Sequence, residues 1–193
     1  LPKDATGLVL FVHGSGSSRF SPRNQYVAEL LNQAGLGTLL FDLLTPEENK
    51  IDEITREYRF DIELLSQRTI MTIDWLSEQP ILENLSIGLF GASTGAAAAL
   101  NAAKARSNDI ECVVSRGGRP DLAMPALAEV KAPTLLIVGS LDTEVLQLNQ
   151  LAKRAISAEC NLVTIKGATH LFEEPGTLQA ATLAAKEWFV KYL

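Results

Sequence analysis

The chain has 193 residues, of which 47% are apolar and 21% are charged, the proportions of an ordinary globular domain with a sizeable core. Its net charge of -6 argues against general binding to nucleic acid or to membrane surfaces. No run approaches the roughly eighteen apolar residues of a membrane span, and no signal-peptide pattern occurs. Cys112 and Cys160 lie in or beside apolar runs, so we expect free thiols and a cytoplasmic location.

The first part of the chain alternates strands and helices. Gly7–His13 (GLVLFVH) is a continuous apolar run, typical of a strand buried on both faces. A Gly/Ser-rich turn leads to a helix over Pro22–Gln33, with Ser21 as its N-cap, and Gly37–Leu43 is the next buried strand. Leu44–Arg59 is rich in charge and contains few apolar residues. It predicts a long surface loop with at most a helical turn.

The alternation then resumes. An amphipathic helix is expected over Phe60–Glu78, and Leu85–Leu100 (LSIGLFGASTGAAAAL) reads as a strand, a tight turn and an alanine-rich helix. The remaining expected elements are strand Ile110–Ser115, a short helical piece near Pro125–Val130, strand Thr134–Gly139, helix Glu144–Ser157, strand Asn161–Lys166 and a helix from about Leu178 to the end.

This order predicts a single α/β domain over residues 1–193, with a mainly parallel sheet and helices on both faces. About eighteen residues follow Ser115 before the next strand, which is too few for a cap domain. Functional side chains are expected at the carboxyl ends of the strands.

The tight turn fits the pattern G-x-S-x-G, with Ser93 between Gly91 and Gly95. Such a turn from strand to helix lifts one hydroxyl above the sheet, beside a helix N-terminus. The glycines suit a place where the backbone is crowded. We expect Ser93 to be a nucleophile, and a purely structural Gly-Ser turn is the alternative.

A serine hydroxyl needs a base within reach and a third group that orients the base. The chain has two histidines, and only His170 lies late in the sequence. Asp142 follows the fifth strand, so Ser93, Asp142 and His170 occur in the order of an α/β-hydrolase triad. Asp142 also suits an N-cap, and Asp121 and Glu144 are reserve candidates for the acid.

The oxyanion hole is expected to use the backbone N–H of Thr94, the residue after the nucleophile. A second N–H is expected from the loop after the first strand, with Ser15 as the first choice and Gly16 as the second. His13 is interpreted as a structural residue that shapes this loop.

Four arginines flank strand ends at the catalytic edge: Arg19, Arg23, Arg116 and Arg119. Guanidinium groups suit carboxylate or phosphate recognition. One interpretation is that they bind an anionic group of a small substrate, with Arg19, Arg116 and Arg119 as candidates. The other is that they hold the loops by pairing with local carboxylates, which are Asp42, Asp121, Glu173 and Glu174.

Several segments together resemble the α/β-hydrolase superfamily, in its dienelactone-hydrolase-like branch. The likeness covers essentially the whole chain and is carried by VHGSGSSRFSPRN (Val12–Asn24), GASTGAAAAL, SRGGRPDL and GATHLFEEPGTL (Gly167–Leu178). It implies an eight-stranded sheet whose second strand is antiparallel. Only six strands are visible here, so we expect the N-terminal hairpin to be absent or displaced, and upstream residues to be trimmed or part of another segment.

The resemblance implies a hydrolase with no cofactor, and it includes relatives joined to phosphoribosyltransferase-like domains. No metal-ligand cluster or phosphate-binding loop pattern occurs in the sequence. Dienelactone hydrolases proper carry cysteine at the nucleophile position, whereas this chain has Ser93. We expect a serine hydrolase that cleaves a small ester, lactone or thioester through an acyl-enzyme. An acyltransferase with the same triad and a non-catalytic binding module are the alternatives.

Overall fold

The computed structural model describes all 193 residues, and its core is one six-stranded sheet. The strands lie in the order β2-β1-β3-β4-β5-β6, and every neighbouring pair is parallel, as the alternating sequence predicts. Their bounds are β1 Gly7–Val12, β2 Leu36–Leu40, β3 Ser86–Ala92, β4 Ile110–Arg116, β5 Thr134–Gly139 and β6 Cys160–Ile165.

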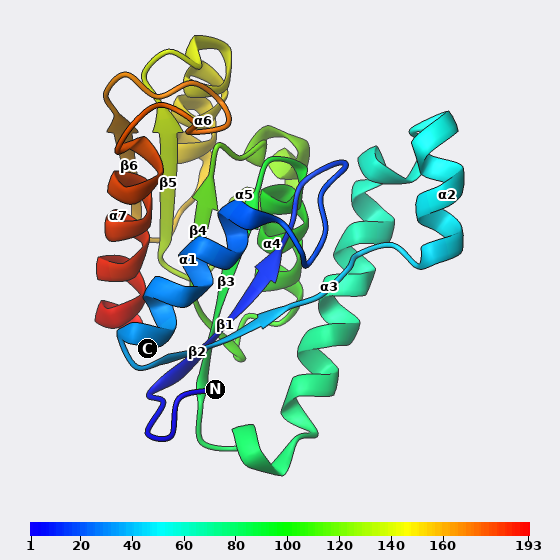
Figure 1. Ribbon diagram of the computed structural model, residues 1–193, viewed down its shortest axis with the longest axis vertical. Coiled ribbons are helices and arrows are strands. Elements are labelled where there is room, and N and C mark those ends of the chain that lie inside the picture. The colour runs from blue at the N-terminus through cyan, green and yellow to red at the C-terminus, as the bar shows by residue number, and fades with distance from the viewer.

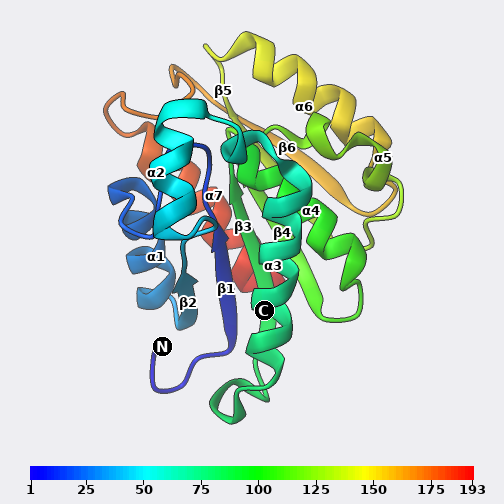
Figure 2. The same cartoon turned by 90° about the vertical axis from the view of Figure 1, so that its right-hand side faces the viewer.

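Helices cover both faces of this sheet (Figures 1 and 2). One face carries α1 and α7, which contact each other, and the other carries α3, α4 and α6. Their bounds are α1 Pro22–Gln33, α3 Ile62–Ser77, α4 Thr94–Ala105, α6 Thr143–Ala155 and α7 Thr177–Tyr192. No helix combines the length and the apolar character that crossing a membrane requires.

The core has two parts because successive strand residues point to opposite faces. Along β1, Leu8, Leu10 and Val12 pack under α3 and α4, while Val9 and Phe11 pack under α1 and α7. Both sets are buried, which explains why these strands read as continuous apolar runs. This double coverage leaves the carboxyl ends of the strands, with their loops, free to carry polar side chains.

The prediction of a loop over Leu44–Arg59 is wrong, because this segment forms helix α2 (Pro46–Thr55) and a 3-10 turn, η1 (Tyr58–Phe60). A capping box starts α2. Thr45 Oγ1 accepts the Glu48 N–H at 3.2 Å, and a Glu48 carboxylate oxygen accepts the Thr45 N–H at 2.8 Å. The helix stands off the sheet beyond α3, as Figure 1 shows.

Two other boundaries differ from the expectation. β2 ends at Leu40, before the predicted Leu43, because the Leu43 N–H leaves the ladder and donates to His13 Nε2 at 3.0 Å. The residues between β4 and β5 form a 3-10 turn, η3 (Pro120–Ala123), and a one-turn helix, α5 (Met124–Leu127). These two short elements are all that follows β4 before β5, in agreement with the expected lack of a cap domain.

Candidate active site

Ser93 lies at a strained turn between β3 and α4. Its backbone has φ 50° and ψ -125°, a region that side chains rarely occupy and that costs about 1–3 kcal/mol. A Cβ on Gly95 would overlap the main-chain oxygens of Val12 and His13, and one on Gly91 would come within 2.5 Å of the Ala96 Cα. The glycines therefore permit the crowding that the sequence pattern predicts.

The acid and the base meet because β5 and β6 end side by side. Asp142 follows β5, His170 follows β6, and His170 Nδ1 lies 2.6 Å from Asp142 Oδ2. The Leu141 N–H donates to the Ala168 carbonyl at 2.9 Å, which ties the two loops together. Gly139 lies so close to Ala168 that a Cβ would overlap its main-chain oxygen.

Asp142 occupies the N-cap position of α6, but its side chain makes no capping hydrogen bond. Its carboxylate is therefore available to orient the imidazole. The reserve candidate Asp121 binds the Arg119 guanidinium at 2.7 and 2.9 Å, and it does not meet His170. Among the candidate acids, Asp142 is the one that the structure places against the base.

Ser93 and His170 line one pocket of about 220 Å³, here called the serine pocket. No hydrogen bond joins Ser93 Oγ to the His170 ring, and such contacts tighten when substrate binds. The His170 side chain is 40% exposed, so solvent reaches the base. The pocket is lined by Gly14, Ser15, Ser17 and Ser21 before α1, Arg23 and Asn24 on α1, Ala92 and Ser93 at the elbow, Arg116 and Gly117 after β4, and His170 and Leu171.

The loop after β1 lies directly against the elbow. A Cβ on Gly14 would come within 2.8 Å of the Ser93 Cβ, and Ser15 Oγ is 2.9 Å from Thr94 Oγ1. Thr94 is the first residue of α4, so its N–H has no acceptor within the helix. The structure thus brings Ser15 and Thr94, whose N–H groups are the expected oxyanion donors, into side-chain contact next to Ser93.

His13 holds this loop and is not part of the pocket that contains Ser93. Its Nε2 accepts the Leu43 N–H at 3.0 Å, so its Nδ1 carries the proton and donates to the Gly14 carbonyl at 3.0 Å. Burial lowers the pKa of His13, which keeps the ring neutral, against smaller raising effects of Gly14 and Asp42. The structural role that the sequence suggests agrees with these contacts.

Comparison with known proteins identifies the fold to which this geometry belongs. Residues 24–192 match the sequence profile of the dienelactone hydrolase family. The chain belongs to this family. A dienelactone hydrolase from Anabaena variabilis shares 57% sequence identity with it and a TM-score of 0.98, over 100% of this chain and 89% of the other. Est1E from Butyrivibrio proteoclasticus shares the fold, with 17% identity and a TM-score of 0.82 over 98% of this chain and 90% of the other.

A longer relative carries a different name. The "Putative phosphoribosyl transferase" of Mycobacterium tuberculosis is 55% identical over all 193 residues. The match covers 43% of that protein, so the chain spans less than half the length of this curated relative.

The family assignment makes the state of the cysteines relevant, because the resemblance implied cysteine at the nucleophile position. Cys112 is buried in β4, and burial raises its pKa to about 12. Burial also raises the pKa of Cys160 to about 11. Neither thiol lines the serine pocket, and both are protonated at neutral pH. The elbow position of this family member is occupied by Ser93.

The structure separates the four arginines that sequence reasoning grouped. Arg19 pairs with Asp42, Arg119 pairs with Asp121 at 2.7 Å, and Arg23 lies 3.4 Å from Glu173. Arg119 does not line the serine pocket, and neither does Arg19. Both arginines make the carboxylate pairs that the loop-holding interpretation predicts.

Arg116 differs from the others because no carboxylate pairs with it. It is 8% exposed, and its Nη2 donates to Asn24 Oδ1 at 3.0 Å, while Nη1 has no partner. The guanidinium also lies over the Phe90 ring, 5.4 Å from the centroid. Asn24 is a functional candidate that sequence reasoning missed. It lies 92 residues away in the chain, and no local pattern links it to Arg116.

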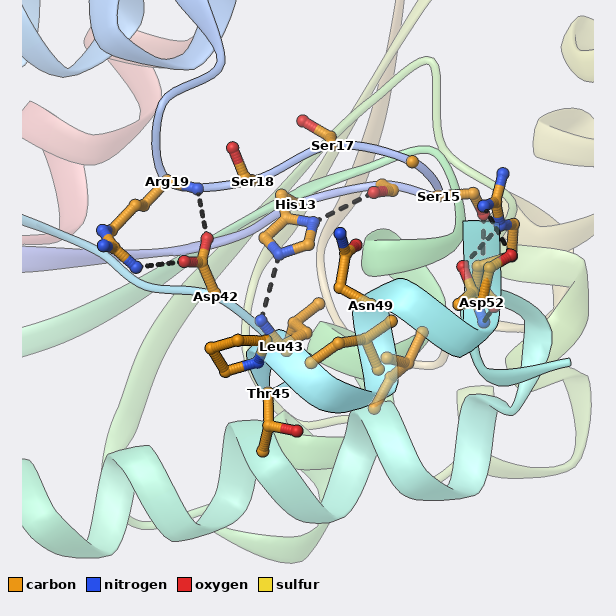
Figure 3. A pocket seen from close by; sticks show the side chains of 16 residues that line it. His13, Ser15, Ser17, Ser18, Arg19, Asp42, Leu43, Thr45, Asn49 and Asp52 are labelled. Carbon is orange, nitrogen blue, oxygen red and sulfur yellow. Dashed lines mark hydrogen bonds and ion pairs between the residues drawn. The ribbon is translucent and has the colours of Figure 1, made fainter. Parts of the chain in front are cut away.

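A second pocket, of about 340 Å³, lies between the β1–α1 loop, the end of β2 and the helix α2 (Figure 3). We call it the α2 pocket. It shares Gly14, Ser15 and Ser17 with the serine pocket. Its other lining residues are His13, Gly16, Ser18, Arg19, Asp42, Leu43, Leu44, Thr45, Pro46, Asn49, Asp52, Arg59 and Leu65.

Proposed function

We propose that this chain is a serine hydrolase that cleaves a small ester, lactone or thioester. The observation that carries the proposal is the 2.6 Å contact between His170 and Asp142, in a site where His170 shares a pocket with the strained Ser93. A nucleophile, a base and an orienting acid are the groups that acyl transfer through a serine requires. Membership of a hydrolase family supports the same reaction class.

In the proposed mechanism, Ser93 Oγ attacks the scissile carbonyl carbon while His170 Nε2 takes the hydroxyl proton. The oxyanion forms against the N–H groups of Thr94 and Ser15. The carbon–oxygen bond then breaks, and the leaving alcohol takes the proton from His170. Asp142 holds the ring by Nδ1 and stabilises the imidazolium in both steps. Water deprotonated by His170 attacks the acyl-enzyme, and the acid product leaves with Ser93 restored.

The size of the serine pocket favours a small substrate. A volume of about 220 Å³ is less than the usual 300–1,000 Å³ of drug-sized ligand sites. The solvent-exposed side of His170 leaves room for an alcohol to depart and for water to enter. An alcohol that entered in place of water would give an acyltransferase with the same triad, so the acceptor distinguishes the two activities.

The name of the longer relative concerns a protein of more than twice this length. We propose that the segment corresponding to this chain supplies hydrolysis. Any transfer of phosphoribosyl groups would then belong to the remaining length of those relatives.

The test uses labelling by a fluorophosphonate and turnover of 4-nitrophenyl butyrate. We expect labelling and turnover in the native protein and loss of both in Ser93→Ala, with an unchanged melting temperature. Ser17→Ala is the matched control, because Ser17 lines the same pocket without lying at the elbow. Labelling that persists in Ser93→Ala would refute the assignment, and an unlabelled native protein would favour the binding module.

A further inference from the structure

The loop that follows β4 binds both main-chain polar groups of Ser93. The Ser93 N–H donates to the Arg116 carbonyl at 3.4 Å, and the Ser93 carbonyl accepts the Arg119 N–H at 3.0 Å. The Ala96 N–H of α4 donates to the same carbonyl at 3.1 Å. The segment from Arg116 to Arg119, here called the β4 loop, thus holds the turn that carries the nucleophile.

The β4 loop needs support from outside its own backbone. Gly117 has φ 52° and is followed by Gly118, and two successive glycines have unusually wide conformational freedom. Gly118 is glycine for lack of space, because a Cβ there would overlap Ser115 Oγ and lie 2.5 Å from the Ala96 Cβ. The strained backbone of Ser93 persists only where its surroundings impose it, so whatever fixes this loop also fixes Ser93.

Asn149 on α6 is the side chain that binds the main chain of the β4 loop. Its Nδ2 donates to the Gly118 carbonyl at 2.9 Å and to the Val145 carbonyl, one turn earlier in the same helix, at 2.8 Å. The residue is completely buried. Asp142 is the N-cap of the same helix, about two turns before Asn149. One helix therefore carries the orienting acid and supports the loop that binds the nucleophile.

An amide is an unfavourable choice for a residue that only fills the core. Asn149 Oδ1 is buried without a hydrogen-bond partner, and a buried acceptor without a partner lowers stability. The neighbouring buried positions of α6 are occupied by Val145 and Ala152. An apolar side chain at position 149 would avoid the unsatisfied oxygen, so the value of the amide lies in its N–H groups.

Two rigid peptide units connect Asn149 with the expected oxyanion donor. The Gly118 carbonyl and the Arg119 N–H belong to one planar peptide group, whose oxygen accepts from Asn149 and whose N–H donates to Ser93. The Ser93 carbonyl in turn shares a plane with the Thr94 N–H. The direction of the Thr94 N–H is therefore coupled to the hydrogen bond of Asn149, although Asn149 does not line the serine pocket.

We propose that Asn149 is a positioning residue that aims the Thr94 N–H at the developing oxyanion through these two peptide units. Loss of the amide would free the peptide between Gly118 and Arg119 to rotate, and the Ser93 carbonyl would lose one of its two donors. Misdirected oxyanion donors stabilise the transition state less but leave the binding of substrate unchanged. The proposal rests on the proposed function, and its structural part does not require turnover.

The test replaces Asn149 by leucine, which has the same branching without polar atoms. We expect kcat for 4-nitrophenyl butyrate, per folded molecule, to fall about 10- to 100-fold with an unchanged KM. Asn149→Ser is the second variant, because a helical serine can bind the carbonyl four residues earlier but is too short to reach Gly118. Asn101→Leu is the matched control, since the Asn101 amide donates to Ser66 Oγ at 3.0 Å, away from the β4 loop.

A transition-state analogue measures the oxyanion site directly. In butylboronic acid, Ser93 Oγ adds to the boron, the hydroxyl proton moves to His170, and the tetrahedral boron carries the negative charge. Its inhibition constant should rise in Asn149→Leu by about the same factor as kcat falls, whereas inhibition by butyramide, which stays planar, should not change. A merely structural role would lower the melting temperature and leave the ratio of the two inhibition constants as it is.

Three results would overturn the positioning role: an unchanged kcat in Asn149→Leu or Asn149→Ser, an equal loss of kcat in Asn101→Leu, or a loss that appears only as a higher KM. If Asn149→Leu does not fold, Asn149→Ser gives the same comparison with the contact to Val145 retained.

Amide hydrogen exchange separates this proposal from the proposed function. The Arg119 N–H should be protected in the native protein and in Asn101→Leu, and it should exchange at least about tenfold faster in Asn149→Ser. This pattern in a native protein that is neither labelled nor active would refute the hydrolase and retain the hold of Asn149 on the β4 loop. Full turnover in both Asn149 variants would refute the positioning role and retain the hydrolase.

Discussion

The serine pocket and the α2 pocket share the β1–α1 loop, but the arginines that line them have different partners. Each is lined by two arginines. In the α2 pocket, Arg19 meets Asp42 and Arg59 meets Asp52, so both charges are neutralised within the wall. In the serine pocket, Arg23 lies 3.4 Å from the exposed Glu173, whereas the buried Arg116 bonds the neutral Asn24 amide and has no carboxylate partner. Paired charges hold a wall in place, whereas an unpaired one is available to a ligand.

Residues that line the α2 pocket also hold the β1–α1 loop in place. Asp52 is 1% exposed and accepts the N–H groups of Tyr58 and Arg59 and the Arg59 Nε–H. The Arg59 carbonyl in turn accepts the Ser15 hydroxyl at 3.2 Å. Through this contact, α2 and η1 hold the loop that carries a proposed oxyanion donor. Asp52 and Arg59 thus have a structural role, whereas the proposed catalytic residues line the serine pocket.

Two aspartates give the sharpest contrast, and Asp142→Asn carries the larger expected effect. An asparagine at this position offers the amide N–H to His170 and stabilises the wrong tautomer, as in other triads, where kcat falls about 10⁴-fold. We expect a loss of that size in steady-state turnover of 4-nitrophenyl butyrate, with the melting temperature nearly unchanged. A loss of less than tenfold would remove Asp142 from the triad.

Asp52→Asn should have the opposite profile. The half-buried Arg59 guanidinium would lose its anionic partner, and the buried hydrogen bonds of Asp52 would weaken. We expect the unfolding free energy to fall by about 3 kcal/mol in urea titrations. Turnover per folded molecule should change only a fewfold, because the contact of Asp52 with the site is indirect. If Asp52→Asn lowered kcat as much as Asp142→Asn without loss of stability, Asp52 would not have the purely structural role assigned to it.

The sequence predicts the turn around Ser93 better than it predicts the residues that line the α2 pocket. Gly91 and Gly95 indicate a crowded backbone, because a side chain at either position would overlap neighbouring main-chain atoms. Ser93, Asp142 and His170 each follow a strand, and the carboxyl ends of parallel strands meet at one edge of the sheet. The parallel sheet follows from the same alternation of apolar runs. These features depend on local patterns and on chain order, which the sequence contains.

Helix α2 was missed although its start signal was present. Thr45 and Glu48 have the capping-box spacing, with Pro46 at the first helical position. The segment has few apolar residues, so periodicity gave no support. Its contacts with the rest of the chain include the ion pair of Glu48 with Arg68, twenty residues away, which no local pattern indicates. The roles of the four arginines were also beyond the sequence, because each role depends on which partner lies near it in space.

The smallest expected effect concerns His13, which holds the loop between the two pockets. Because burial lowers the pKa of His13 below its ordinary value of 6.5, the unfolded chain takes up a proton before the folded chain does. Stability should therefore be full above about pH 6.5 and fall as the pH decreases below it, by at most about 1.4 kcal/mol per pH unit. Denaturation by urea between pH 5 and pH 7.5 measures this slope, above the range in which the carboxylates titrate.

The background His170→Gln isolates this effect, because it leaves His13 as the only histidine. Replacement of His13 by Asn in that background should flatten the slope, since the group that titrates is then absent. Protonation of His13 would place a hydrogen on Nε2, where the Leu43 N–H now donates, and the loop would lose its anchor to the end of β2. Both pockets use Gly14, Ser15 and Ser17 from that loop. A stability that stays constant from pH 7.5 to pH 5 would mean that the loop does not depend on a neutral His13.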